Sequence, residues 1–508
     1  MVEKEFLVDY RADDSHAVIF FDLRDDADSK TKYDIIMDGK KIQTINKTHV
    51  TIDGLSPDTR YNIEILMEGQ KSIGSLVVHT KRTKRRIDIS RAPYNAVGDG
   101  KTLNTKVIQR ALDDCDENSC VYIPEGTYLT GALNMHSNSE LYLEKGALLQ
   151  GTDNPEDYLP KIKSRFEGYE MECYRSLINM GELDHDASYV CENVNILGQG
   201  SIMGGGWSLA KKIAKLEAIR LKDYIDSLGD KIKEYEKPET ISHRARGRLI
   251  NISNSRNVWI HGLKLGYGPA WNIHFIYSDN IVTDHCLIES KGVWNGDGWD
   301  PDSSTNSTIF ACEFLTEDDS VAVKSGKNPE GNRINRPTKH IRVFDCVCHF
   351  GHGLCIGSEM SGGVEDVRLW DCDMGPTWSG IEIKGTKKRG GYVRNISVRD
   401  IIASHVMIHS VTFNDDGIGA PTPPIFENCS FERMHLLGRF LDNNAGKNDW
   451  HDCPSILLCG FNEEGYEVKN ISFKDIEMEN PAPGVDSIHM ENCSNISFNN
   501  ISSVERNL

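Results

Sequence analysis

Two short acidic segments of the chain contain residues suited to breaking a glycosidic bond. The segment 294–302 (WNGDGWDPD) contains Asp297, and the segment 316–324 (TEDDSVAVK) contains Asp318 and Asp319. Hydrolysis with inversion needs an acid that protonates the leaving oxygen and a base that activates water on the opposite face of the sugar ring. Neighbouring carboxylates do not all ionise easily, so we expect at least one to keep its proton while another is charged.

Two later segments carry side chains suited to holding a sugar. In the segment 350–354 (FGHGL), two glycines flank His352, and Gly353 allows a ligand to approach the backbone closely. In the segment 380–385 (GIEIKG), Lys384 offers a compact positive charge to a substrate carboxylate. These residues add a binding function to the acid and base of the earlier segments.

A repeat in the second part of the chain predicts how these segments meet. From Ile87 onward a polar residue recurs at intervals of about 25 residues, which is the length of one coil of a solenoid. Apolar residues follow it at one, three and six positions, and this pattern predicts two short strands per coil. The polar residues are Asn257, Asn280, Asn306, His340, Asp366, Asn395, Asn470 and Asn495. We therefore expect an all-β fold, a parallel β-helix, with Asp297 and Asp318 side by side in successive coils.

The cysteines follow the same repeat. The chain has fourteen of them, and Cys286, Cys312, Cys346 and Cys372 occupy one inward-facing position of four coils. A thiol is small and apolar enough to fill a core beside leucine and isoleucine. Zinc is not expected because no CxxC pair or histidine accompanies them, and disulfides between in-register parallel strands would be strained. We expect a stack of buried free thiols.

Two parts of the chain fall outside the repeat. Residues 1–83 alternate polar and apolar residues in short runs, and the run 49–61, with Leu55, Pro57 and Tyr61, resembles the fibronectin type III pattern. Residues 84–508 form the predicted β-helix domain. Within it, residues 207–240 show helical periodicity. This insertion is interpreted either as a cover over a bare flank or as a wall that closes one end of a substrate groove.

Composition and charge exclude several classes of function. The chain has 508 residues and a net charge of -19, which argues against a nucleic-acid partner. No apolar run approaches the length of a membrane span or of a signal-peptide core, so no membrane partner and a cytoplasmic location are expected. A local basic cluster, Lys387, Lys388 and Arg389, stands out against this background. It is either a substrate contact or a solvated loop, and a helical insertion leaves an oligomer open.

The four motifs, in this order, resemble the signature of glycoside hydrolase family 28, the polygalacturonases. In that family the motifs read NTD, DD, GHG and RIK, and here they read NGDG (295–298), EDD (317–319), GHG (351–353) and IEIK (381–384). The segment 95–105 (NAVGDGKTLNT) is similar to the entry segment of the same superfamily. The resemblance spans residues 90–500 and implies a right-handed parallel β-helix that hydrolyses α-1,4-galacturonosyl linkages of pectic substrates with inversion and without metal or other cofactor.

The resemblance also implies a role for each residue of the motifs. Asp318 would be the general acid, while Asp297 and Asp319 would hold and activate the water. His352 would support the acid's protonation and contact substrate, and Lys384 would bind a uronate carboxylate. Asn295, in the first motif, would belong to the substrate-binding residues.

Two departures from the family pattern bear on the substrate. Glu382 stands where the family usually has arginine, so a cationic contact is replaced by a like charge. Either the basic cluster at 387–389 supplies the missing contact, or the sugar in that subsite is not a plain galacturonate. Gly296 replaces threonine, which is a milder change.

The domain order resembles that of the exo-acting bacterial members of the family, which release mono- or disaccharides from chain ends. Three alternatives stay open. In the first, the enzyme is a hydrolase of the same family that acts on rhamnogalacturonan or a substituted pectin. In the second, the protein is a calcium-dependent pectate lyase, with Asp297, Asp300 and Asp302 as ligands of a hard cation. In the third, it is a carbohydrate-binding β-solenoid without catalysis.

Overall fold

The computed structural model describes residues 6–68, 71–235, 238–442 and 449–506. Its chain divides into two compact units, one formed by Met1–Ile87 with Cys115–Cys120 and the other by Asp88–Asp114 with Val121–Leu508. Among the described residues, no helix is both long and apolar enough to cross a membrane.

The first unit contains two antiparallel sheets. One has the strand order β1-β2-β5 and the other β4-β3-β6-β7. Alternate residues of β6, such as Ile63 and Ile65, are buried and form the core with Ile19 and Ile35. The hydroxyl of Tyr61 accepts a hydrogen bond from the backbone N–H of Ser56 at 2.8 Å, which fixes the turn before β6. The strands are β1 (Val8–Ala12), β2 (His16–Phe21), β3 (Tyr33–Met37), β4 (Lys40–Ile45), β5 (His49–Asp53), β6 (Arg60–Met67) and β7 (Lys71–His79).

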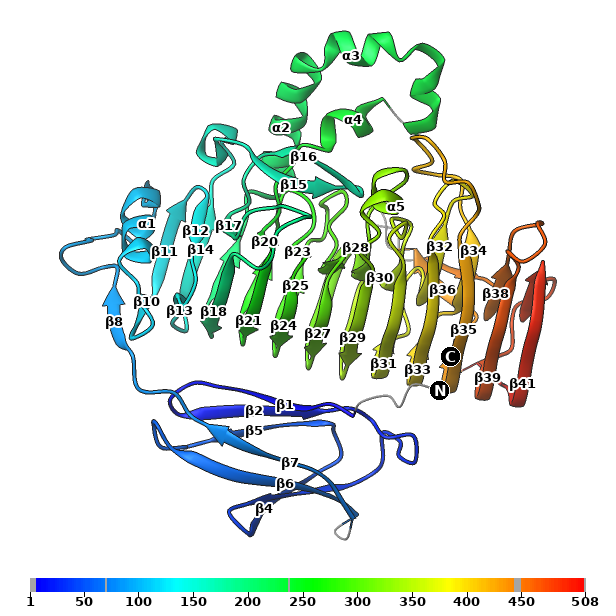
Figure 1. The fold of residues 1–508 in the computed structure, drawn as a ribbon, viewed down its shortest axis with the longest axis horizontal. Coiled ribbons are helices and arrows are strands. Elements are labelled where there is room, and N and C mark those ends of the chain that lie inside the picture. The colour runs from blue at the N-terminus through cyan, green and yellow to red at the C-terminus, as the bar shows by residue number, and fades with distance from the viewer. Residues whose placement is uncertain (1–5, 69–70, 236–237, 443–448, 507–508) are drawn as a thin grey trace. The chain divides into compact units, whose positions relative to one another are not determined.

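The second unit is the predicted parallel β-helix, which Figure 1 shows as successive coils coloured from cyan to red. Its strands pair in parallel with the strand one coil further on, as in Val258↔Ile281 and Ile309↔Val343. The pairings form three stacks, so a coil has three strand positions and not the two that the repeat predicted. The third was missed because it follows a loop of variable length and therefore falls outside the regular spacing.

The first stack contains β10 (Ser119–Ile123), β13 (Glu140–Leu143), β18 (Cys191–Gly198), β21 (Ser255–His261), β24 (Asp279–Asp284), β27 (Thr305–Phe310), β29 (Thr338–Phe344), β31 (Val364–Met374), β33 (Tyr392–Ala403), β35 (Ile425–Leu436), β39 (Val468–Glu479) and β41 (Cys493–Val504). The second begins with β9 (Asp99–Leu103), β11 (Gly126–Thr130), β14 (Ala147–Gly151), β19 (Ser201–Met203), β22 (Lys264–Gly266) and β25 (Leu287–Glu289), and continues in the long bent strands. A short strand, β8 (Arg85–Asp88), pairs with β10.

The third stack, called here the site stack, carries the motifs. Its strands are β12 (Leu133–Met135), β17 (Ile178–Met180), β20 (Ile250–Ser253), β23 (Ile273–Ile276), β26 (Trp299–Asp302), the ends of β28 (Glu313–Val323) and β30 (Val347–Ile356), β32 (Ile381–Gly385), β34 (Val406–Ser410), β38 (Ile456–Cys459) and β40 (Ile488–Glu491). Its inward residues are in register, with Trp299 beside Val321, Val321 beside Leu354 and Leu354 beside Ile381. The alternating residues on the outer face are therefore also aligned from coil to coil.

The recurring polar residue of the repeat lies near the start of a strand of the first stack, as Asn257 does in β21, Asn280 in β24 and His340 in β29. Asn257, Asn280 and His340 have φ values of 56°, 55° and 57°, in the left-handed region that asparagine tolerates better than most residues. The asparagines also bond to one another, as when Asn280 Nδ2 donates to Asn257 Oδ1 at 2.9 Å. Backbone conformation and this ladder together explain why the position stays polar.

The cysteine prediction is confirmed. Cys286, Cys312, Cys346 and Cys372 are free and buried, and they lie one coil apart in the core. The backbone N–H of Cys286 donates to Cys312 Sγ at 3.4 Å, and Cys346 and Cys372 repeat this contact at the same distance.

Insertions project from the coils beside the site stack. The hairpin of β15 (Ile162–Phe166) and β16 (Tyr169–Cys173) precedes α2 (Gly206–Arg220), α3 (Lys222–Ser227), the 3-10 helix η2 (Gly229–Tyr235) and α4 (Glu239–His243), which Figure 1 shows at the top of the coils. Within the predicted insertion at 207–240, the described residues thus include helices, and residues 236–237 lie outside the described part of the chain. A second hairpin, β36 (Arg439–Asp442) and β37 (Asp449–Asp452), follows β35, and the remaining helices are α1 (Thr105–Asp113), η1 (Pro155–Tyr158) and α5 (Glu330–Ile334).

Candidate active site

The structure brings the four predicted catalytic residues together at the edge of the site stack. The backbone N–H of Gly298 donates to the carbonyl of Asp319 at 2.9 Å, which sets Asp297 beside Asp319, and Asp319 is in register with His352. Asp297 and Asp319 have 4% and 5% of their side chains exposed, whereas Asp318 and His352 each have 28% exposed. The stacking of coils thus makes one row from residues that are far apart in sequence.

A cavity of about 140 Å³ opens at this row. It is lined by Glu167, Tyr235, Thr240, Trp271, Trp294, Asn295, Asp297, Asp318, Asp319, Lys324, Gly357, Ser358, Glu359, Lys384, Phe413 and Asn414. Five of these are predicted site residues. The others come mainly from the insertions and from loops after the site-stack strands, where no repeat pattern marks a residue as functional.

Lys324 is the most informative residue that the sequence reasoning missed. Its Nζ lies 3.1 Å from Asp297, 3.7 Å from Asp300 and 3.7 Å from Glu359, and 4.7 Å from the centre of the Trp271 ring. It belongs to the same segment as Asp318 and Asp319, on the outward alternation of the strand. That alternation was the signal that would have identified it.

The carboxylates of the row differ in protonation. Burial and the charge of Asp319 raise the pKa of Asp318, against the opposing charge of His352. Burial also opposes ionisation of Asp319, but Lys384 and His352, whose Nδ1 lies 2.9 Å away, hold the pKa of Asp319 below its ordinary range. The two carboxyl groups thus differ, since Asp318 keeps its proton more readily and Asp319 ionises more readily.

The neighbours of His352 bear on the role expected of it. Burial opposes its charged form, yet Asp319 and Asp318 raise the pKa of His352 to about 9, so the imidazole is a cation at neutral pH. A cation 3.4 Å from Asp318 disfavours the protonated acid. The proton of Asp318 is maintained by burial and by Asp319, while His352 keeps Asp319 ionised.

Asp297 shares its environment with Asp300. Burial and the neighbouring carboxylates of Asp300, Asp318 and Asp319 raise the pKa of Asp297 well above its ordinary range, against the charge of Lys324. Burial likewise raises the pKa of Asp300 to about 8. In the described part of the chain, Asp297 Oδ1 and both oxygens of Asp300 accept no hydrogen bond. The pair thus holds a proton beside an open acceptor, which suits the positioning of a water molecule.

Lys384 is held by Glu382, the residue that departs from the family pattern. Lys384 Nζ lies 3.0 Å from Glu382 Oε2 and 3.7 Å from Asp319. The other oxygen of Glu382 lies 2.7 Å from Nε2 of His409, which is in register with Lys384 one coil further on. Burial disfavours the charge on Glu382, but Lys384 and His409 keep its pKa well below the ordinary range. Glu382 is therefore a neutralised partner behind Lys384, not a like charge facing substrate.

The basic cluster at 387–389 binds other parts of the protein. Lys387 pairs with Glu463, and Lys388 Nζ donates to the carbonyl of Asp415 at 2.7 Å. Arg389 is fully buried and donates to the carbonyl of Ser358 at 2.7 Å. Since none of the three lines the cavity, the structure contradicts their expected role as substrate contacts.

Gly353 allows two coils to pack closely, and Asn295 lines the cavity. A Cβ on Gly353 would lie 2.0 Å from the carbonyl of Gly380. The sequence had led us to expect the close approach of a ligand at Gly353, but it is the backbone of the next coil that approaches. Asn295 lines the cavity, and its Oδ1 accepts a hydrogen bond from Arg246 at 2.6 Å.

The donor set expected for calcium does not converge. Asp302 Oδ1 accepts from Arg165 at 2.6 Å, and its Oδ2 lies 3.3 Å from His274. Asp297 and Asp300 both face the ammonium of Lys324. These carboxylates are therefore neutralised by basic side chains where a calcium site would need them for the ion.

Ion pairs connect distant segments beside the cavity, and Glu167, one of their members, lines it. Arg244, after α4, contacts Glu167 at 2.7 Å and Asp416 at 3.0 Å. Lys327 also pairs with Asp416. Tyr235 and Thr240 of the insertion line the cavity directly, so the insertion forms a wall of the site, as the second of the two interpretations had it.

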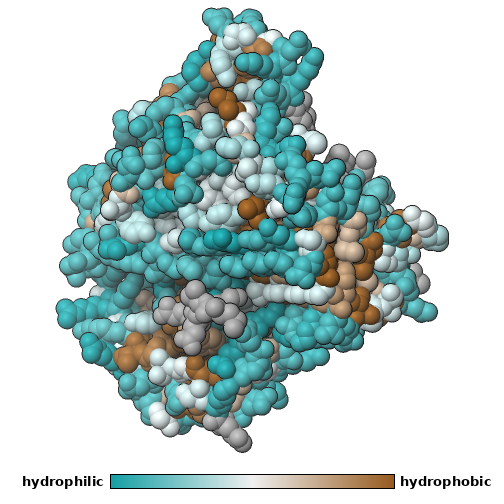
Figure 2. Space-filling view, turned by 45° about the vertical axis from the view of Figure 1, so that its right-hand side comes forward, coloured by the Kyte–Doolittle hydropathy of each residue, from teal (hydrophilic) through white to brown (hydrophobic). Residues whose placement is uncertain are grey.

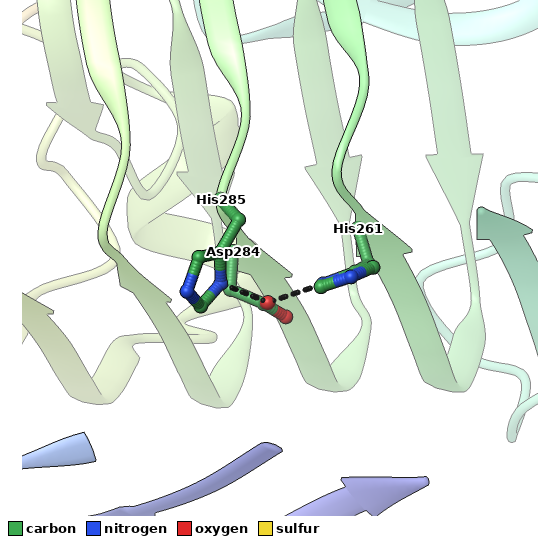
Figure 3. Close-up of side chains that lie close together, drawn as sticks. All are labelled: His261, Asp284 and His285. Atoms are coloured by element: carbon green, nitrogen blue, oxygen red, sulfur yellow. Dashed lines mark hydrogen bonds and ion pairs between the residues drawn. The ribbon is translucent and has the colours of Figure 1, made fainter. Parts of the chain in front are cut away.

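A further cluster of titratable residues lies on the first stack, away from this cavity. Figure 3 shows His261 and His285 directed at the carboxylate of Asp284. Their Nδ1 atoms lie 2.5 Å and 2.7 Å from Asp284 Oδ1, and Trp259 Nε1 donates to Oδ2 at 2.7 Å. These contacts satisfy the charge of Asp284 and connect it to His261 of the preceding coil.

Comparison with known proteins gives consistent results. Residues 203–417 match the model of glycosyl hydrolases family 28. The chain is 24% identical to an exo-poly-alpha-D-galacturonosidase of Dickeya chrysanthemi, over 89% of this chain and 78% of that protein. Its fold matches the family 28 exopolygalacturonase of Yersinia enterocolitica with a TM-score of 0.78 and 22% identity, covering 99% and 100% of the two chains. A hyperthermoactive exopolygalacturonase of Thermotoga maritima matches with a TM-score of 0.65 and 26% identity, covering 82% and 91%.

Proposed function

We propose that this chain is a member of glycosyl hydrolases family 28 and an exo-acting polygalacturonase that removes galacturonate from the ends of pectic chains. The observation that carries the proposal is the row of carboxylates at a cavity closed on one side. The reaction adds water across the glycosidic bond, with inversion at the anomeric carbon and without metal.

The protonation pattern supports the following assignment of the steps of the reaction. Asp318 gives its proton to the leaving oxygen, because its raised pKa keeps the proton available and its side chain reaches solvent. Asp319, which is ionised, accepts a proton from the attacking water. Asp297 positions that water from the opposite side of Asp319. The general acid and the general base of the glycosidase are thus both aspartates, and their different surroundings give them different protonation states.

Two lysines in the cavity wall could bind the carboxylate of the substrate. Lys324 and Lys384 both line the cavity, and both are held by buried carboxylates that fix the position of each ammonium. A galacturonate carboxylate that enters the cavity would exchange water for such a charge-assisted contact. Lys384 is the better placed, because its Nζ lies 3.7 Å from Asp319 and thus beside the reacting carbon.

The exo mode is supported by the closed wall. Arg244, Glu167, Asp416 and Lys327 connect the insertion to the loop after β34, so a polysaccharide chain could not continue past the cavity on that side. An enzyme with one closed end binds chain ends and releases small products.

The catalytic assignment is tested with digalacturonate, trigalacturonate and polygalacturonate in EDTA. We expect release of monomer or dimer from chain ends, and a loss of about 10²–10⁴-fold in kcat for Asp318→Asn because the acid is removed. Asp223→Asn, which changes an exposed carboxylate on α3, is the control and should keep full activity. Retention of activity in Asp318→Asn, or an unsaturated product absorbing in the near ultraviolet, would contradict the proposal.

The exo mode is tested by opening the wall. Tyr235→Ala removes a side chain that lines the cavity, and we expect trimers and longer products to appear from polygalacturonate. Ile219→Ala, an exposed residue of α2, should leave the product pattern unchanged. Internal cleavage by the unaltered protein would show that the wall does not block the chain.

A further inference from the structure

We propose that the sugar on the leaving side of the cut bond is held by a row of aromatic rings and not through its own carboxylate. This inference rests on the proposed function and specifies its substrate class. The substrate is a chain that ends in galacturonate, and the sugar next to that end can be neutral, esterified or charged. The rings are those of Trp378, Phe440 and His451, called here the ring row.

The position of the acid shows where the leaving sugar lies. Asp318 and His352 each have 28% of the side chain exposed, whereas Asp297 and Asp319 are almost fully buried. The acid must touch the leaving oxygen, so the leaving sugar lies on the exposed side of the row, beyond Asp318 and His352. The wall at Arg244 and Asp416 closes the other end of the site.

The ring row continues from His352 along the coils. The ring centre of Trp378 lies 6.4 Å from that of His352, Phe440 lies 4.6 Å from Trp378, and His451 stacks on Phe440 at 5.5 Å. All three rings are at least partly exposed. Phe440 and His451 are in register in the hairpin of β36 and β37.

Backbone contacts hold the ring row against the catalytic residues. The N–H of Trp378 donates to the carbonyl of Gly351, next to His352, at 2.8 Å. The N–H of Leu441 donates to the carbonyl of Pro376 at 3.2 Å, which ties the hairpin to the loop that carries Trp378. The rings are therefore presented from fixed backbone and not from a free loop.

In the described part of the chain, which leaves out residues 443–448 of this hairpin, the charged side chains beside the ring row contact other protein groups. Glu382, where the family has arginine, is anionic and neutralised by Lys384 and His409. Arg439 lies 4.8 Å from the Trp450 ring and 3.3 Å from Glu479. Lys291 lies over the ring of Phe350 at 4.2 Å and is the cation chosen to test the idea.

These observations define how the leaving sugar binds. A galacto-configured pyranose has an axial 4-hydroxyl, which leaves one face of the ring rich in C–H bonds. Such a face packs on an aromatic ring, where burial of apolar surface adds to the electrostatic attraction of the ring. A carboxylate on this sugar would point away from the rings into solvent, so its presence has little effect on binding.

Three substrates separate the leaving side from the reacting side. α-Galacturonosyl fluoride has no leaving sugar, digalacturonate has a charged one, and galacturonosyl-α-1,4-galactose has a neutral one. For the unaltered protein we expect kcat/KM on the two disaccharides to agree within about threefold. Trp378→Ala should lower kcat/KM on both by about tenfold or more and leave hydrolysis of the fluoride within about twofold.

Matched variants exclude a merely structural effect. Trp378→Phe keeps a ring and should recover most of the loss, and Trp450→Ala, an exposed tryptophan of the same hairpin, should match the unaltered protein. An equal loss on the fluoride, or no loss on either disaccharide, would overturn the proposal. So would a preference of about thirtyfold or more for digalacturonate that disappears in Lys291→Ala. If the unaltered protein hydrolyses none of the three substrates, the proposed function itself fails, and this inference fails with it.

Discussion

The contact between Glu382 and Lys384 allows a quantitative prediction about Glu382→Gln. At the observed 3.0 Å, Coulomb's law gives about 5–6 kcal/mol for the pair at an effective dielectric constant of 20. Desolvation of both charges offsets part of this energy, and removal of one partner of a buried pair costs about 3–5 kcal/mol. We expect the free energy of unfolding of the β-helix to fall by about that amount. In the variant, Lys384 would keep its buried charge but would have lost the carboxylate of Glu382, leaving Asp319 as a carboxylate partner.

The same change should weaken substrate binding. Without Glu382, Lys384 is drawn toward Asp319, 3.7 Å away, and its ammonium no longer faces the cavity as it does now. A hydrogen bond to a charged group contributes about 1.5–3 kcal/mol, so kcat/KM on digalacturonate should fall about 10–100-fold, mainly through KM. The family-like change Glu382→Arg should be worse still, because it places a second cation beside Lys384 and His409.

The assay is equilibrium urea unfolding followed by circular dichroism, with initial rates on the same samples. Lys384→Met and the double variant Glu382→Gln/Lys384→Met complete a cycle in which the double variant should lose less stability than the two single changes together. Since the pKa of Glu382 is depressed, the stability difference should be present above its ordinary pKa of about 4.3 and shrink as the pH falls below it. Additive changes within about 0.5 kcal/mol would refute the coupling between Glu382 and Lys384.

Three more expectations follow from other parts of the structure. The pKa of His352 is raised to about 9, so the stability that this residue contributes is full below its ordinary pKa of about 6.5 and is lost as the pH rises through 9. The difference in Tm between the unaltered protein and His352→Gln should therefore vanish by about pH 10. The buried thiols of the cysteine stack should not react with Ellman's reagent in the folded protein but should all react in urea, and rapid labelling of Cys312 when folded would show that the core is open. Removal of divalent cations with EDTA should leave the rate unchanged, because Lys324 occupies the position between Asp297 and Asp300, and a calcium-dependent rate would contradict this.

The repeat allowed the fold and the catalytic row to be predicted from the sequence. Both depend on interactions between neighbouring coils, whose strands keep their register although the loops between them differ in length, so a strand position in one coil predicts its neighbour in the next. Asp297, Asp319 and His352 align for this reason, and Cys286 aligns with Cys312 for the same one.

Only the tertiary structure decided which charges face the cavity. Lys324 lines it, whereas Arg389, which the sequence singled out, is buried against Ser358. Glu382 looked like a repulsive charge because its neutralising partner His409 is on the next coil, at a position without a motif. The effect of a charge depends on burial and on neighbours within a few ångströms, and neither is encoded by local spacing.

The same limit applies to the shape of the site. The wall that closes one end joins Glu167, Arg244 and Asp416, which come from three irregular segments far apart in the chain. Periodicity identified the helical insertion but not its target, because loops follow no repeat and their ion pairs join segments that are far apart in the sequence. The sequence by itself determined the fold and the chemistry of the catalytic row, and the packing of the loops on the coils decided which end of the site is closed.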